Sequence, residues 1–221
     1  MSKLPIFSYL FLLLLLSCNE PLEKEISLEL NEKYNNIRAI NAIANCEGPN
    51  GKYVSEMQSF EDGSCIFYQD FEYRDAAFYA QITANNQGFV LDSLGTPVDT
   101  LSKEVIEIVR SHEFHRLQID PQHFFSSISF SEKIKDGIIA FSAEDRLNNP
   151  VKLTYNEREQ LILKIDMVNP LDTAESIEIF NTHWAESEYG KLVQKVKIVQ
   201  AQKDTFTFDY HSIELNKNKI N

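Results

Sequence analysis

The chain has 221 residues, which is enough for one sizeable hydrophobic core, and no Pro/Gly/Ser-rich linker or internal repeat divides it. Its formal net charge of −12, with no stripe of Lys or Arg to offset it, would repel phosphate backbones and anionic headgroups. We therefore expect a single domain and no nucleic acid partner.

The amino terminus carries a short apolar segment that ends in a cysteine. Lys3 precedes an apolar run over residues 4–16 that is broken by Pro5 and Ser8, and Ser17-Cys18 follow. A membrane-spanning helix needs about 20 apolar residues, so this run is too short to be one. It resembles the signal of secreted bacterial lipoproteins. That resemblance implies removal of signal peptide 1–17, lipidation of Cys18, an acidic tether over residues 18–25, and a membrane anchor in the cell envelope. An ordinary cleaved signal is the alternative.

Residues 26–44 carry apolar side chains three or four positions apart, which predicts an amphipathic helix. Gly48-Pro49-Asn50-Gly51 would end it. The period then changes to two, and we predict short strands over residues 53–59, 65–73, 78–84 and 88–92. Asp62-Gly63 is typical of a hairpin turn between the first two strands.

Helical spacing returns over residues 101–117, where Ser102 is the expected N-cap. Asp120-Pro121 is expected to start a further short helical turn. The last third reads as strands at residues 127–134, 138–143, 151–155, 161–168, 176–184, 192–200 and 205–213. Their connections are too short for crossover helices, so neighbouring strands should pair antiparallel.

This order of elements resembles the LolA/LolB-like superfamily of outer-membrane lipoprotein carriers and receptors. The resemblance covers roughly residues 26–215 and rests on element order. It implies an α+β domain over residues 26–216, followed by a tail over residues 217–221. In that domain a strongly curved antiparallel half-barrel of about ten to eleven strands holds helices on its concave face. It also implies a cavity for an acyl chain or another apolar ligand.

We therefore expect a non-enzymatic, membrane-anchored lipoprotein that binds an apolar ligand or an acylated partner and needs no cofactor. An envelope protein partner would be compatible with this role. Two alternatives stay open: a packed surface module without a cavity, and a hydrolase whose site no motif reveals. The aromatic residues expected to line the cavity are Phe67, Phe71, Tyr73, Phe78, Trp184, Phe206, Phe208 and Tyr210.

The cysteines and histidines allow further interpretations. Cys46 and Cys65 would lie in an oxidising compartment, where they either form a disulfide or remain separate buried side chains. His112, His115 and His123 are candidate metal ligands. However, the spacing of the first two is shorter than in zinc proteases, and Glu113 would point away from their common face. We expect helix-end histidines and no metal.

Overall fold

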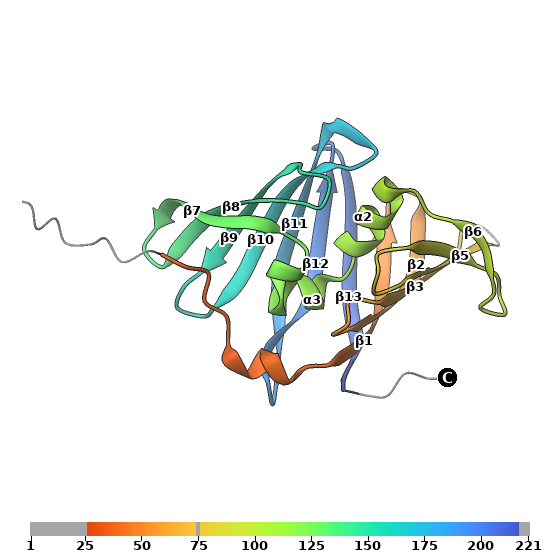
Figure 1. The fold of residues 1–221 in the computed structure, drawn as a ribbon, viewed down its shortest axis with the longest axis horizontal. Coiled ribbons are helices and arrows are strands. Elements are labelled where there is room, and N and C mark those ends of the chain that lie inside the picture. Colours follow the sequence, from red (N-terminus) through yellow and green to blue (C-terminus); the bar gives the residue numbers. More distant parts are fainter. Residues whose placement is uncertain (1–25, 74–75, 217–221) are drawn as a thin grey trace, which may run out of the picture.

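The computed structural model describes residues 26–73 and 76–216 (Figure 1). The predicted signal peptide, Cys18, the tether and the tail lie outside these residues. Within the described part of the chain, no helix has the length and apolar character needed to cross a membrane.

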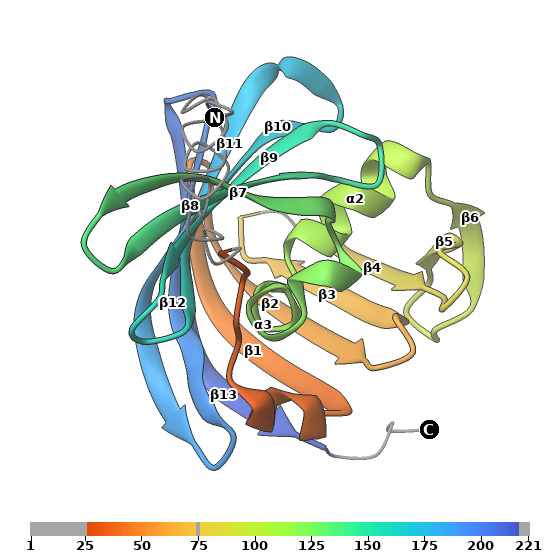
Figure 2. The ribbon, with the colours of Figure 1, turned by 60° about the vertical axis from the view of Figure 1, so that its left-hand side comes forward.

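A single antiparallel sheet of 13 strands curls around the helices in the order β6-β5-β4-β3-β2-β1-β13-β12-β11-β10-β9-β8-β7 (Figures 1 and 2). Strands adjacent in sequence pair with each other except β6 and β7, which form the two edges of the sheet. β1 also pairs with β13, which brings the first and last strands side by side. The strands are β1 (Ala39–Gly48), β2 (Gly51–Phe60), β3 (Cys65–Phe71), β4 (Ala76–Ile82), β5 (Gly88–Leu91), β6 (Pro97–Thr100), β7 (Ser126–Lys135), β8 (Ile138–Glu144), β9 (Pro150–Asn156), β10 (Leu161–Asn169), β11 (Asp172–Ser187), β12 (Gly190–Gln200) and β13 (Asp204–Leu215). The predicted α+β half-barrel is confirmed, with more strands than expected.

The helices lie on the concave side of the sheet (Figure 2). They are the 3-10 helix η1 (Glu32–Asn36), α2 (Lys103–Ser111), α3 (Phe114–Ile119) and the 3-10 helix η2 (Pro121–His123). Ser102 caps α2 as predicted, since its Oγ accepts a hydrogen bond from the backbone N–H of Val105 at 3.3 Å. The single helix predicted over residues 101–117 is divided at His112 and Glu113. This break turns α3 inward, where all its residues are buried.

The helix predicted over residues 26–44 is wrong. Only residues 32–36 are helical, and β1 begins at Ala39. The spacing of four between Ile40 and Ala44 fits a strand as well as a helix, because Ala42 between them is also buried. Residues on β1 pair with both β2 and β13, so strand pairing on two sides prevails over the helical pattern.

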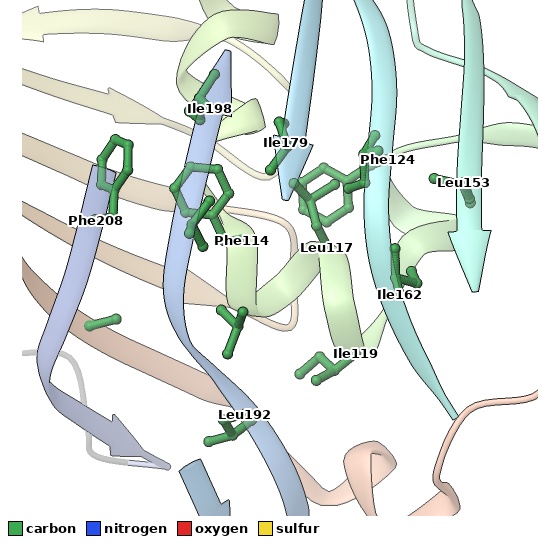
Figure 3. Packing of buried hydrophobic residues seen from close by; sticks show 14 of the residues in the cluster. Phe114, Leu117, Ile119, Phe124, Leu153, Ile162, Ile179, Leu192, Ile198 and Phe208 are labelled. Carbon is green, nitrogen blue, oxygen red and sulfur yellow. The ribbon is translucent and has the colours of Figure 1, made fainter. Parts of the chain in front are cut away.

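The main hydrophobic core lies between α3 and strands β8–β13 together with β1 (Figure 3). Phe114 and Leu117 of α3 are 2% and 3% exposed, and they pack against strand residues such as Phe208 and Ile179 (Figure 3). A smaller cluster lies under α2, and its members are Met57, Cys65, Phe67, Ile82, Ile106 and Val109. The two helices therefore cover different parts of one curved sheet.

Of the two alternatives for the cysteines, the structure has the separate side chains: Cys46 and Cys65 are both free and buried. Strand β2 separates them: Cys46 pairs with Tyr53, whereas Cys65 pairs with Ser59 at the other end of β2. An offset of six residues along a strand corresponds to about 20 Å. A disulfide needs Cα atoms within about 7 Å of each other.

We predict that both thiols can be alkylated in denatured, unreduced protein that lacks residues 1–18. In the native state alkylation should be slow, because burial raises the pKa of the Cys46 thiol to about 12 and that of Cys65 well above its ordinary value. Mass spectrometry after iodoacetamide treatment measures this directly. Denatured protein that gains no label without reductant would show that the disulfide exists.

Candidate functional site

A cavity of about 330 Å³ opens between the concave face of the sheet and the carboxyl end of α2. The β1–β2 turn, the β10–β11 turn and the adjoining ends of β3, β12 and β13 complete its walls. Its lining is mostly aromatic, aliphatic or uncharged polar, and consists of Gly48, Pro49, Asn50, Gly51, Tyr53, Gln69, Phe71, Tyr73, Ile108, Ser111, His112, Asn169, Leu171, Ile177, Ile198, Gln200 and Phe206. The cavity is therefore suited to an apolar ligand.

Strand pairing brings the aromatic wall together. Tyr53 of β2 pairs with Phe71 of β3, and their ring centroids are 5.5 Å apart. The ring of Tyr73 lies 5.5 Å from that of Phe71 and extends this wall beyond the strand. Phe208 packs behind the wall, with its ring 6.1 Å from that of Tyr53. These rings form a continuous apolar surface along one side of the cavity.

His112 is half-buried and lines the cavity. Its Nδ1 lies 2.8 Å from the carbonyl oxygen of Ile108, and its ring packs 5.7 Å from that of Phe208. Burial lowers the pKa of His112, which favours the neutral imidazole. Since a carbonyl only accepts hydrogen bonds, Nδ1 carries the proton and Nε2 keeps its lone pair.

Three of the eight aromatics expected to line the cavity do so: Phe71, Tyr73 and Phe206. The other five pack elsewhere: Phe67 and Phe78 lie in or against the smaller cluster, Phe208 and Tyr210 belong to the main core, and Trp184 packs against that core. Sequence reasoning missed Tyr53, Ile177 and Ile198. Tyr53 could have been found from the sequence, because the alternating pattern of the two predicted strands makes it the cross-strand partner of Phe71.

A second depression of about 400 Å³ lies beside the β12–β13 turn. It is more open than the first cavity and is lined mainly by polar and charged residues such as Glu47, Lys203 and Asp204. Although its volume is larger, it does not enclose a ligand or offer apolar walls. We regard it as a shallow surface depression and not as a ligand site.

The three candidate histidine ligands have separate environments. His115 Nε2 lies 2.7 Å from the carbonyl oxygen of Val193, with its ring against Tyr210. His123 lies against Phe124 on η2. Across residues 26–73 and 76–216, no group of three His, Cys, Asp or Glu side chains is placed to hold a metal ion. The candidate metal site is therefore not assembled.

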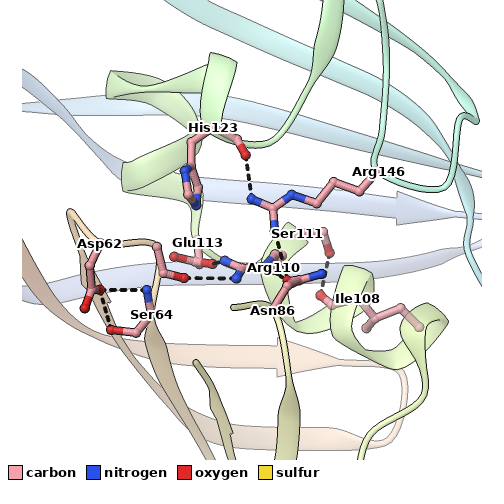
Figure 4. A network of polar contacts seen from close by, with 10 residues as sticks. Asp62, Ser64, Asn86, Ile108, Arg110, Ser111, Glu113, His123 and Arg146 are labelled. Atoms are coloured by element: carbon pink, nitrogen blue, oxygen red, sulfur yellow. Dashed lines mark hydrogen bonds and ion pairs between the residues drawn. The ribbon is translucent and has the colours of Figure 1, made fainter. Parts of the chain in front are cut away.

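A buried polar network ties the helices to the sheet (Figure 4). Arg110 of α2 forms an ion pair of 3.0 Å with Glu113, and both side chains are 2% exposed. Arg110 also donates to Asn86 Oδ1 and to the carbonyl oxygen of Gly63, each at 2.9 Å. Arg146 donates to the same Asn86 oxygen at 2.9 Å. One guanidinium thus joins the α2–α3 junction to the β2–β3 and β4–β5 turns.

The β2–β3 turn can reach this network because Gly63 has no side chain. A Cβ atom at this position would lie 2.5 Å from the ring of His123, and the backbone there has a φ of +80°. Arg146 donates to the carbonyl oxygen of His123 at 2.6 Å. The turn, η2 and the β8–β9 connection therefore meet at the same point.

No protein-family model matches the sequence, and no curated protein shows significant sequence similarity to it. Solved structures do match. A LolA superfamily protein from Nitrosomonas europaea superposes with a TM-score of 0.59 at 12% sequence identity, over 85% of this chain and 92% of that one. The chain has the LolA-like fold.

Two further solved structures also match. A domain assigned to outer membrane lipoprotein sorting, from Vibrio parahaemolyticus, gives a TM-score of 0.59 at 10% identity, over 89% of this chain and 94% of that one. A DUF1329 family protein from Desulfovibrio piger gives 0.54 at 9% identity, over 84% and 88% of the two chains. The predicted resemblance is confirmed as a likeness of fold.

Proposed function

We propose that this protein is a membrane-anchored lipoprotein of the cell envelope that binds an acyl chain or another apolar ligand, free or attached to a partner, and catalyses no reaction. The observation that carries this proposal is the cavity of about 330 Å³ with apolar walls on the concave face. Ligand pockets in proteins have volumes of about 300–1,000 Å³. A volume near the lower limit favours one acyl chain over several.

Two features outside the cavity support the envelope role. The fold is shared with a domain assigned to outer membrane lipoprotein sorting. The sequence before the described residues resembles a lipoprotein signal that ends at Cys18, and lipid attached there would hold the domain at a membrane. The cavity counts against the alternative of a closely packed module without a ligand site.

Binding of N-phenyl-1-naphthylamine, an uncharged fluorophore that brightens in apolar surroundings, tests the proposal on the chain from Asn19 onward. We expect saturable binding that is at least about tenfold weaker in Ile177→Trp, a loss of about 1.4 kcal/mol. Ile177 lines the cavity, so an indole there takes up space that the ligand needs.

The matched control is Ile213→Trp. Ile213 is a half-buried isoleucine of β13 that packs against the main core and does not line the cavity. This variant should bind the fluorophore like the unmodified chain. Absence of saturable binding, or equal binding by both variants, would refute the proposed function.

A further inference from the structure

We infer that the cavity selects amphiphiles with an uncharged polar end, and that a hydroxyl or amide of this end donates a hydrogen bond to Nε2 of His112. This inference rests on the proposed function, because it specifies the ligand class of the same cavity.

The first argument is the lack of charge in the cavity wall. Among the described residues that line the cavity, none is Asp, Glu, Lys or Arg. A carboxylate, phosphate or ammonium group that entered would lose its hydration and find no partner of opposite charge. The cost of burying an unpaired ion is several kcal/mol. Hydroxyl, ester and amide groups avoid most of this cost.

The second argument concerns two amide side chains that line the cavity, one at the end of β10 and one at the end of β12. Asn169 Nδ2 and Gln200 Nε2 both donate to Glu175 Oε2, at 3.0 Å and 3.1 Å. These hydrogen bonds lower the pKa of Glu175, so the group that holds the two amides is a carboxylate. Two of the amide donors that an anionic ligand would need, those of Asn169 and Gln200, are therefore directed at an existing negative charge. An anion here would meet repulsion.

The third argument is an unused acceptor. His112 donates through Nδ1 to the carbonyl oxygen of Ile108, as described above. No described residue forms a hydrogen bond with Nε2, and Nε2 is not a fully buried atom. It is therefore accessible, and the accessible space next to His112 is the cavity. A neutral imidazole nitrogen accepts hydrogen bonds, so it pairs with a ligand that offers O–H or N–H.

Three ligands with the same acyl chain separate these effects: 1-monolauroylglycerol is neutral with hydroxyl donors, methyl laurate is neutral without donors, and laurate is an anion at pH 8. Each displaces N-phenyl-1-naphthylamine from the chain that starts at Asn19, below its critical micelle concentration. We expect the monoacylglycerol to bind about tenfold more tightly than the methyl ester, the effect of one good hydrogen bond. Laurate should bind at least tenfold more weakly than the ester.

Two variants test the role of His112. His112→Leu removes the acceptor and should make the monoacylglycerol and the methyl ester bind equally, the two affinities being compared within the same variant. His112→Gln retains an acceptor atom at a similar distance from the backbone and should preserve part of the preference.

Laurate that binds as tightly as the monoacylglycerol would overturn the inference and leave the proposed function intact. So would a preference that His112→Leu does not reduce. If the fluorophore does not bind the unmodified chain at all, the proposed function and this inference both fail.

Discussion

Replacing Arg110 with Ala should lower the free energy of unfolding by about 3–5 kcal/mol, because the variant leaves the Glu113 carboxylate buried without its partner. Burial raises the pKa of Glu113, and the positive charge of Arg110 opposes this shift and so favours the carboxylate. The same change removes the hydrogen bonds to Asn86 and Gly63. Urea unfolding followed by the fluorescence of the single tryptophan, Trp184, measures the loss.

Lys152→Ala is the control for this prediction. Lys152 forms an ion pair of 2.7 Å with Glu132, but the two side chains are 45% and 57% exposed. Exposed pairs contribute about 0–1 kcal/mol. Equal destabilisation by the two variants would mean that the buried network does not hold the helices to the sheet.

Replacing Phe114 with Ala should also cost about 3–5 kcal/mol, the usual range for a phenylalanine in a packed core. Phe114 is 2% exposed, and its ring lies 5.1 Å from that of Phe208 in an edge-on arrangement. Its loss would open a void between α3 and β13. The same urea titration measures this cost, which is large against a typical domain stability of about 5–15 kcal/mol.

Phe130→Ala provides the comparison, since Phe130 on the edge strand β7 is 42% exposed. We expect a change of about 0.5 kcal/mol or less at such a surface position. A Phe114 variant as stable as the Phe130 variant would contradict the central position that α3 has in the core.

Most strands could be predicted because their signals are local. The last seven strands are β-prone runs between short turns, and each predicted range overlaps an observed strand. β6 was missed because all four of its residues are exposed, so no apolar alternation marks it. The helix predicted over residues 26–44 is wrong because the spacing of Ile40 and Ala44 fits both the helical period and the strand period. The pairing of β1 with both β2 and β13 decides between them.

The cavity was harder to predict because its walls come from distant parts of the chain. Phe71 and Phe206 were expected there as aromatic residues of strands, whereas Ile177 and Ile198 have no feature that distinguishes them from core residues. His112 was noted for its spacing from His115. Its actual surroundings, the Ile108 carbonyl and the Phe208 ring, depend on how α2 docks on the sheet. Docking is a tertiary property that spacing does not reveal.

Photocrosslinking tests the central claim most directly. A monoacylglycerol with a diazirine in its acyl chain is irradiated with the chain from Asn19 onward, and the labelled peptides are identified by mass spectrometry. Label should fall on the β1–β2 turn and on β12 near Ile198, both of which line the cavity, and Ile177→Trp should abolish it. Label confined to the outer face of the sheet, or unchanged in that variant, would contradict a ligand site on the concave face.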